Sequence, residues 1–249
     1  MLIFPTQTVA DIRNAFIELY KSGKFVENQN KTGSKTVEII NAAFIADEEA
    51  IFGTVNQEWV ERESEWYHSM SLNVNDIPGG APQVWKMVAD ENGFINSNYG
   101  HLIFSDLKFN QFDKCAEQLE ADEFSRRAEM IYTRPSIQIE YNKNGMSDFI
   151  CTEVVQYVIR HGELIALVKM RSNDAWAGYR NDLAWQKEVQ YMLWDRLVRT
   201  YPNLKIGPIV WNAGSIHIYE KQFYLIENFI ETGNIHIDKS EWLKTHPAN

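Results

Sequence analysis

The chain has 249 residues, of which 45% are hydrophobic, and a formal net charge of −10. This length and composition fit one large α/β or α+β domain, or two small ones, with a substantial core. The acidic balance argues against general binding to the nucleic acid backbone, but it allows a local cationic pocket for a single phosphate.

The two cysteines, Cys115 and Cys151, lie far apart and lack metal-ligand spacing, so we expect no metal site and a reduced setting. The first residues lack the basic start and the apolar run of a signal peptide. No stretch has the length of a transmembrane helix. We therefore expect a cytoplasmic protein without membrane contact.

In the N-terminal half, apolar residues at helical spacing alternate with polar turns. Residues 37–44 read as a strand, and residues 30–36 form a polar loop with two lysines. Residues 96–100 read as a loop. The spacing predicts helices over 9–20, 56–70, 85–89 and 111–120.

The C-terminal half is richer in strand patterns. It has one long predicted helix, over 182–200. Strands are predicted over 137–141, 149–159, 163–170, 206–211 and 215–219. No repeat or linker interrupts the chain, so we expect a single domain over residues 1–249.

Cys151 and Arg171 stand at facing ends of two strand-like runs that a turn at His161 and Gly162 joins. A hairpin would bring them close together. A thiol beside a guanidinium can be held as the reactive thiolate. Taken alone, a cysteine in an apolar strand is usually a small core residue.

Glu63 shares a helix face with Trp59 and Trp66, which would fit it for proton transfer, although such a glutamate is normally solvated. Asp182 stands at the start of the predicted long helix. It reads equally well as the N-cap of that helix.

Arg171 and Ser172 together offer a fork for phosphate oxygens. The pair Arg126 and Arg127 is more often a solvated surface feature than an anion clamp. His217 and Tyr219 alternate along a strand and so share a face; alone they would be packing residues. The combination of a thiol, cations, carboxylates and aromatics indicates covalent chemistry on a flat, phosphorylated substrate.

Several blocks occur in the order found in a known family, over about residues 9–233. They are Asn30-Lys31-Thr-Gly-Ser, Glu63-Ser-Glu-Trp66, Trp85 to Gly93, Asn98-Tyr99-Gly100, Ser125-Arg126-Arg127, Phe149-Ile-Cys151-Thr, Arg171-Ser172-Asn-Asp174 with Gly178 and Asn181-Asp182, and Gly214-Ser-Ile-His217-Ile-Tyr219. In these blocks the chain resembles thymidylate synthases, and within that family more closely the deoxycytidylate 5-hydroxymethylases of T-even bacteriophages.

Two departures from ordinary synthases sharpen the resemblance. The position that reads the pyrimidine edge is Asn in synthases that use dUMP, and here it is Asp182. A carboxylate accepts from the cytosine amino group and, when protonated, donates to the ring nitrogen. The nucleophile is flanked by Ile150 and Thr152 where most synthases have Pro and His, which also resembles the phage enzyme.

The resemblance implies a mixed sheet with flanking helices, packed back to back in a homodimer. It implies that Cys151 adds to carbon 6 of dCMP, that carbon 5 takes up the one-carbon unit of 5,10-methylenetetrahydrofolate, and that water completes hydroxymethylation. The implied roles are catalysis for Cys151, Glu63 and Asp182; phosphate binding for Lys31, Arg171 and Ser172, with the partner's Arg126 and Arg127; sugar binding for His217 and Tyr219; and the folate side for Trp85, Tyr99, Asp174 and Gly178.

Three alternatives stay open. Hydride transfer would make the chain a thymidylate synthase or a cytosine-methylating variant. CMP would make it a ribonucleotide enzyme. A regulatory homologue would bind nucleotide without turnover, although a binding module needs no nucleophile. A phage source would place the protein in the host cytoplasm, with enzymes of nucleotide synthesis as candidate partners.

Overall fold

The computed structural model describes residues 5–27 and 35–247. The chain forms two compact units. The first unit contains Met1–Val55, Arg171–Ala184 and Val210–Asn249, and the second contains Asn56–Met170 and Trp185–Ile209. Two elements run from one unit into the other: helix α7 (Ala177–Leu197) and strand β7 (Lys205–Tyr219). The assignment of residues 1–249 to a single domain stays a prediction.

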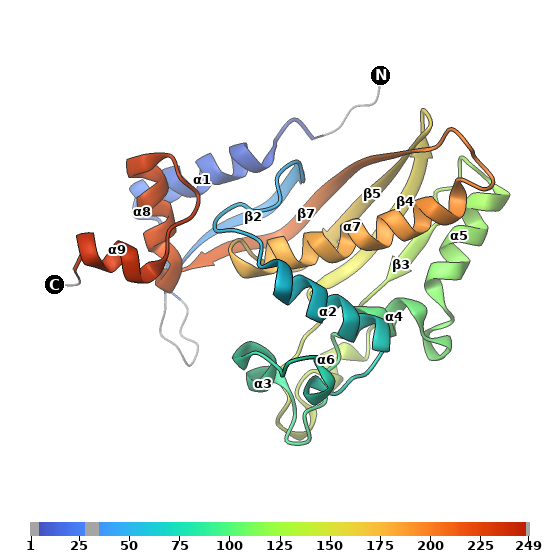
Figure 1. The fold of residues 1–249 in the computed structure, drawn as a ribbon, viewed down its shortest axis with the longest axis horizontal. Coiled ribbons are helices and arrows are strands. Elements are labelled where there is room, and N and C mark those ends of the chain that lie inside the picture. Colours follow the sequence, from blue (N-terminus) through green and yellow to red (C-terminus); the bar gives the residue numbers. More distant parts are fainter. Residues whose placement is uncertain (1–4, 28–34, 248–249) are drawn as a thin grey trace. The chain divides into compact units, whose positions relative to one another are not determined.

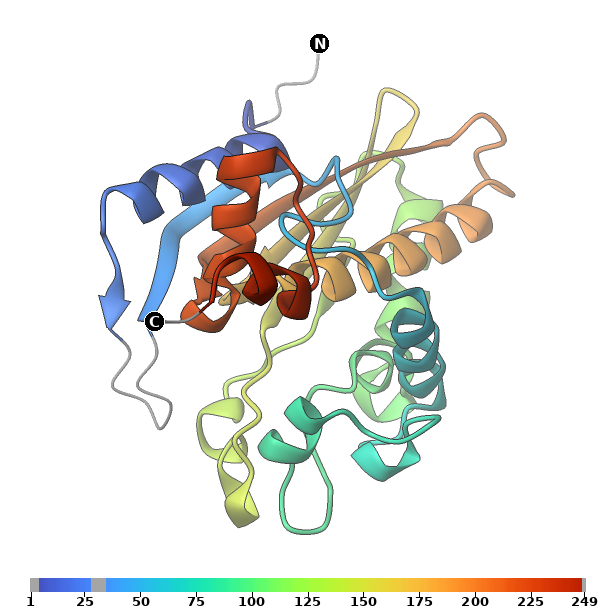
Figure 2. The same cartoon turned by 60° about the vertical axis from the view of Figure 1, so that its left-hand side comes forward.

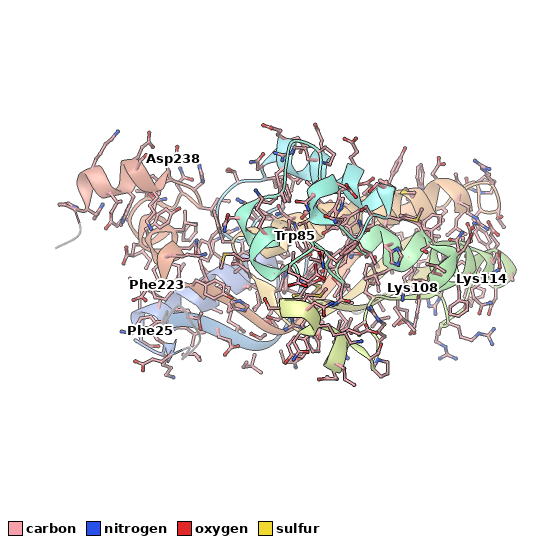
Figure 3. All side chains as sticks on the ribbon, turned by 90° about the horizontal axis from the view of Figure 1, so that it is seen from below. Phe25, Trp85, Lys108, Lys114, Phe223 and Asp238 are labelled. Carbon is pink, nitrogen blue, oxygen red and sulfur yellow. The ribbon has the colours of Figure 1, made fainter. Side chains whose placement is uncertain are left out.

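The first unit is a small sheet with helices. Strand order is β1-β2-β7, with antiparallel pairs, and β6 runs parallel to β7, so the pairing is mixed. Helix α1 contacts β2 and α8, and Figure 2 shows α1 in blue running along β2. Phe25 and Phe223 stack with ring centroids 5.5 Å apart (Figure 3). The elements are α1 (Val9–Lys21), β1 (Val26–Glu27), β2 (Lys35–Ile45), β6 (Asn173–Asp174), η4 (Glu220–Gln222), α8 (Phe223–Thr232) and α9 (Lys239–Thr245).

Helix α1 begins where the sequence signals it. Thr8 and Asp11 form a capping box, so two backbone N–H groups at the helix start are satisfied. The apolar face predicted for residues 9–20 is buried in the first unit. The helix over 9–20 and the strand over 37–44 are confirmed. Lys31 and its loop lie outside the described residues.

The second unit packs helices on the antiparallel strands β5-β4-β3. Strands β4 and β5 form the predicted hairpin, drawn in yellow and orange tones in Figure 1. Helix α4 contacts α2 and α5, and α5 contacts β3. The elements are α2 (Gln57–Ser69), η1 (Val74–Asp76), α3 (Gln83–Val88), α4 (Tyr99–Phe104), η2 (Asp106–Lys108), α5 (Gln111–Ala121), β3 (Glu129–Ile131), α6 (Ile137–Glu140), η3 (Lys143–Gly145), β4 (Thr152–Arg160) and β5 (Glu163–Met170).

The strand predicted over 137–141 is wrong, because this segment forms helix α6. Ile137 is buried and Ile139 is 68% exposed. An alternation of only two isoleucines cannot separate a strand from one helical turn. The loop predicted over 96–100 is also partly wrong, because Tyr99 and Gly100 are the first residues of α4 and Asn98 caps that helix.

Two boundaries in the C-terminal half differ from the prediction. Helix α7 begins at Ala177, five residues before Asp182. The two strands predicted over 206–211 and 215–219 are one strand, β7. It stays paired with β2 in one register on both sides of Asn41, which has a φ of 55°.

Candidate active site

Glu63 and Trp85 meet in the second unit. Asn56 caps α2 by accepting a hydrogen bond from Trp59 N, and two turns later Glu63 is 7% exposed. The indole Nε1 of Trp85 donates to Glu63 Oε1 at 3.2 Å. The solvated alternative for this glutamate is wrong, and two predicted residues are joined in one contact.

Trp66 supports that contact from the same helix. Its ring lies edge-on to Trp85, with centroids 5.4 Å apart at 63°, and it is fully buried. Tyr99 is in the same unit, stacked on Tyr67 with centroids 5.3 Å apart. Tyr99 is only 4% exposed, so it presents little surface to a ligand.

Cys151 directly precedes β4, and its thiol is half-buried. The first pair of the hairpin is Thr152 with Met170, which are the sequence neighbours of Cys151 and Arg171. The other thiol, Cys115 in α5, is buried, and that burial raises its pKa to about 12. Of the two cysteines, Cys151 therefore has the exposure that a nucleophile needs.

Asp182 lies inside α7 in the first unit, so the N-cap alternative is wrong. Its Oδ2 accepts a hydrogen bond of 2.8 Å from Asn173 Nδ2. Gly178 is also close: a Cβ there would lie 3.2 Å from Asn173 Nδ2 and 3.2 Å from Asp174 Cβ. Gly178 thus lets α7 approach β6 without crowding these two side chains.

Asp174 and His217 pair side by side on the parallel strands β6 and β7. Burial raises the pKa of the Asp174 carboxyl. Burial also lowers the pKa of His217, against the opposing effect of Asp174 and Glu38. His217 Nε2 lies 3.1 Å from Tyr219 Oη, which confirms that these two side chains share a face.

Sequence reasoning gave no role to Asn173, Ser215 or Glu38. Ser215 alternates with His217 and Tyr219 along β7, and that period of two was the available signal. Ser215 Oγ donates to Glu38 Oε1, and Glu38 faces His217 across the ladder. Only the strand register places Glu38 here, and register is not readable from one sequence.

The cationic residues are spread over several elements. Arg171 is exposed in the first unit, and its carbonyl accepts from Ser215 N at 3.1 Å. Arg126 and Arg127 are exposed in the second unit, in the turn before β3. Within the described chain neither of these two guanidinium groups has a carboxylate within 4.0 Å, so both are available to an anion.

Among residues 5–27 and 35–247, no group of three or more His, Cys, Asp or Glu side chains could hold a metal ion. Within those same ranges no helix is long and apolar enough to cross a bilayer.

The family model "Thymidylate synthase" matches residues 14–241. The chain is 48% identical over 248 residues to the deoxycytidylate 5-hydroxymethyltransferase of Enterobacteria phage T4, across 97% of this chain and 98% of that enzyme. It is 49% identical over 243 residues to the enzyme of the same name from Enterobacteria phage T6, with the same coverage.

The thermostable thymidylate synthase A from Bacillus subtilis has a similar fold. The TM-score is 0.61 at 20% identity, across 88% of this chain and 83% of that one. The predicted α+β fold, a mixed sheet with flanking helices, is confirmed.

Proposed function

Because this chain belongs to the thymidylate synthase family, we propose that it is a deoxycytidylate 5-hydroxymethyltransferase. The observation that carries the proposal is the identity of 48% over nearly the whole chain to the phage T4 enzyme. The reaction converts dCMP to 5-hydroxymethyl-dCMP, with 5,10-methylenetetrahydrofolate as co-substrate and water as the second reactant.

Cys151 is the nucleophile in this proposal. Its thiolate forms a bond to carbon 6 of the pyrimidine, which places electron density on carbon 5. Carbon 5 attacks the one-carbon unit that the folate supplies at the formaldehyde level and loses its own proton, and tetrahydrofolate leaves as the bond between its nitrogen and that unit breaks. An exocyclic methylene on carbon 5 remains as the acceptor for water. Water then provides the hydroxyl group, and the bond between sulfur and carbon 6 breaks as the thiolate leaves.

Glu63 orders that water and relays protons. A buried carboxylate held by an indole N–H has a fixed orientation, which proton transfer requires. Trp85, half-buried beside Glu63, offers a flat surface that fits the folate ring system. Asp174 and Gly178 are the other residues proposed for the folate side. Tyr99 fits less well, because its ring is buried against other tyrosines.

Asp182 reads the base. The Asn173 amide donates to Oδ2, so that oxygen is committed as an acceptor and the carboxyl plane is fixed. In this proposal a carboxyl oxygen of Asp182 accepts a hydrogen bond from the cytosine amino group. A site built for this hydrogen bond disfavours uracil, because the uracil carbonyl oxygen that replaces the amino group is an acceptor and would face a carboxylate oxygen with no proton between them.

The phosphate is bound by Arg171, Ser172 and Lys31, while His217 and Tyr219 hold the sugar hydroxyl. Arg126 and Arg127 serve the second subunit of a homodimer. In support, both are exposed and lack a carboxylate partner in the described chain.

The activity test is release of tritium from carbon 5 of labelled dCMP and, separately, of dUMP, with methylenetetrahydrofolate present. Dihydrofolate absorbance is followed in parallel. Release from dCMP without dihydrofolate supports the proposal. Release from dUMP with dihydrofolate indicates a thymidylate synthase, and release from neither indicates a binding protein.

The dimer is tested by mixing two inactive variants, Cys151→Ala and Arg126→Ala with Arg127→Ala. Subunit exchange should restore activity, because one site of each mixed dimer then has an intact thiol and intact partner arginines. No restoration, in a mixture shown by native mass spectrometry to contain mixed dimers, would place the arginines outside the partner's site.

A further inference from the structure

Asp148 lies three residues before Cys151 and is 7% exposed. Its Oδ2 accepts hydrogen bonds from Asn96 N at 2.6 Å and from Ser97 N at 2.8 Å. Its Oδ1 accepts from Ser97 Oγ at 2.7 Å. One carboxylate thus fastens two consecutive residues of a loop that is about fifty positions away in sequence.

Residues 96–98 of this loop make further hydrogen bonds to the rest of the second unit. Asn96 Nδ2 donates to the carbonyl of Asp148 at 3.1 Å, and Arg134 donates to Asn96 Oδ1 at 3.1 Å. Asn98, which follows Ser97, donates to the carbonyls of Trp66 at 2.9 Å and Ser71 at 2.8 Å. A continuous set of hydrogen bonds therefore runs from the segment before Cys151 to the end of α2, the helix that carries Glu63.

The hydrogen bonds to the Asp148 carboxylate contribute more than packing alone. A buried carboxylate is costly unless its oxygens are satisfied. Hydrogen bonds to a charged acceptor are roughly twice as strong as neutral ones. Three such bonds to two adjacent residues fix the Asp148 side chain, three residues before the thiol of Cys151.

We infer that Asp148 is a positioning residue that holds Cys151 in place for attack, an inference that rests on the proposed role of Cys151 as nucleophile. Asp148 itself touches no substrate in this account. It acts through the backbone of residues 148–151, and Ser97 is its main partner. A displacement of about 1 Å at a reacting atom can cost about 100-fold in rate.

The test compares two variants of one residue. Asp148→Ala removes all three acceptor contacts. Asp148→Asn keeps a carbonyl oxygen for the two backbone N–H groups, and its amide donates to Ser97 Oγ, so it keeps the geometry and loses only the charge. The matched control is Gln190→Ala in the same unit, because buried Gln190 also joins two elements, donating to the carbonyls of Leu164 at 2.8 Å and Gly207 at 3.2 Å.

In the tritium-release assay, kcat of Asp148→Ala should fall about 100-fold while KM for dCMP changes little. Asp148→Asn should recover most of that loss, and Gln190→Ala should keep wild-type kcat. The inference is overturned when Asp148→Ala keeps wild-type kcat, or when Asp148→Asn or Gln190→Ala falls as far as Asp148→Ala. Should Asp148→Ala not fold, Ser97→Ala decides: a fall of about tenfold supports the inference, and wild-type kcat overturns it.

A second readout needs no substrate. The rate at which iodoacetamide alkylates Cys151 is measured by peptide mapping, which separates it from Cys115. Asp148→Ala should change this rate at least about threefold, with Asp148→Asn and Gln190→Ala close to wild type. Equal rates in all four proteins would overturn the inference. If the wild type releases no tritium from dCMP, the proposed function fails, and the alkylation rates still test the placement of Cys151.

Discussion

In the first unit His217, Tyr219 and Asp174 are held by strand pairing, whereas in the second unit Glu63 and the segment before Cys151 are held by side-chain hydrogen bonds. His217 and Tyr219 lie on β7, and Asp174 lies on β6, which pairs with it. In the second unit, Glu63 is held by the Trp85 indole, and the segment before Cys151 by Asp148. Strand register fixes a binding surface, while specific hydrogen bonds orient the groups that make and break bonds.

The comparison predicts that variants of Cys151 and Glu63, in the second unit, change turnover and leave nucleotide binding intact. Cys151→Ser should reduce kcat by about 10⁴-fold or more, because the hydroxyl is a far weaker nucleophile than the thiolate. Binding of dCMP, measured by calorimetry, should stay within about threefold of wild type. A large loss of dCMP affinity would show that the division between the units is wrong.

A change in the first unit should alter the choice of substrate. Asp182→Asn should shift the ratio of kcat/KM for dCMP over dUMP toward dUMP by about 100-fold or more, because an amide matches the uracil edge. Competition between the two labelled nucleotides measures this ratio. Asn181→Ser, at the neighbouring position on α7, is the control and should keep the preference for dCMP.

Trp85→Phe should have a smaller effect. It keeps the aromatic ring but removes the hydrogen bond to Glu63, and a hydrogen bond to a charged group contributes about 1.5–3 kcal/mol. We expect kcat to fall about tenfold or more with unchanged dCMP affinity. Trp59→Phe on α2 is the control, since that ring packs under Arg62. Equal effects from both variants would mean that the Trp85 hydrogen bond has no special role.

The smallest effect concerns pH. Burial lowers the pKa of His217 below its ordinary 6.5, so the unfolded chain binds this proton more readily than the folded one. Its contribution to stability is present above pH 6.5 and is lost as the pH falls through the lowered pKa. Denaturant unfolding at pH 8 and pH 5 should therefore show less acid destabilisation in His217→Gln than in wild type. His161→Asn, in the exposed turn between β4 and β5, serves as the control, and its loss of stability between pH 8 and pH 5 should match that of wild type.

Long periodic segments and the hairpin were predictable because each is specified locally. The apolar face of α1 and the turn between β4 and β5 are each determined by residues that are close together in the sequence. Helix α6 was missed because two isoleucines fit either period. The start of α7 was missed because residues 177–181 are not strongly amphipathic. In the structure Gly178, in the first turn of this helix, lies close to Asn173 and Asp174.

The candidate site was predictable as a list of residue types and not as a set of contacts. The blocks around Glu63 and Trp85 were recognised, but their hydrogen bond joins residues 22 positions apart. Asn173, Glu38 and Asp148 have no signal of their own, because an amide or carboxylate reveals its partner only when strands pair and loops close. These side chains orient the predicted residues, and their contacts become visible only in the folded structure.

The division of the chain has a consequence for its synthesis on the ribosome. The first unit needs both the earliest and the latest residues, since β2 (Lys35–Ile45) pairs with the end of β7 (Lys205–Tyr219). At about 5–20 residues per second, strand β2 waits roughly 10–35 s for that partner to be made. The second unit can begin to assemble in the meantime. Throughout that interval most of the β2 edge that later pairs with β7 has no partner strand, and such an exposed edge is a binding site for chaperones that recognise extended segments.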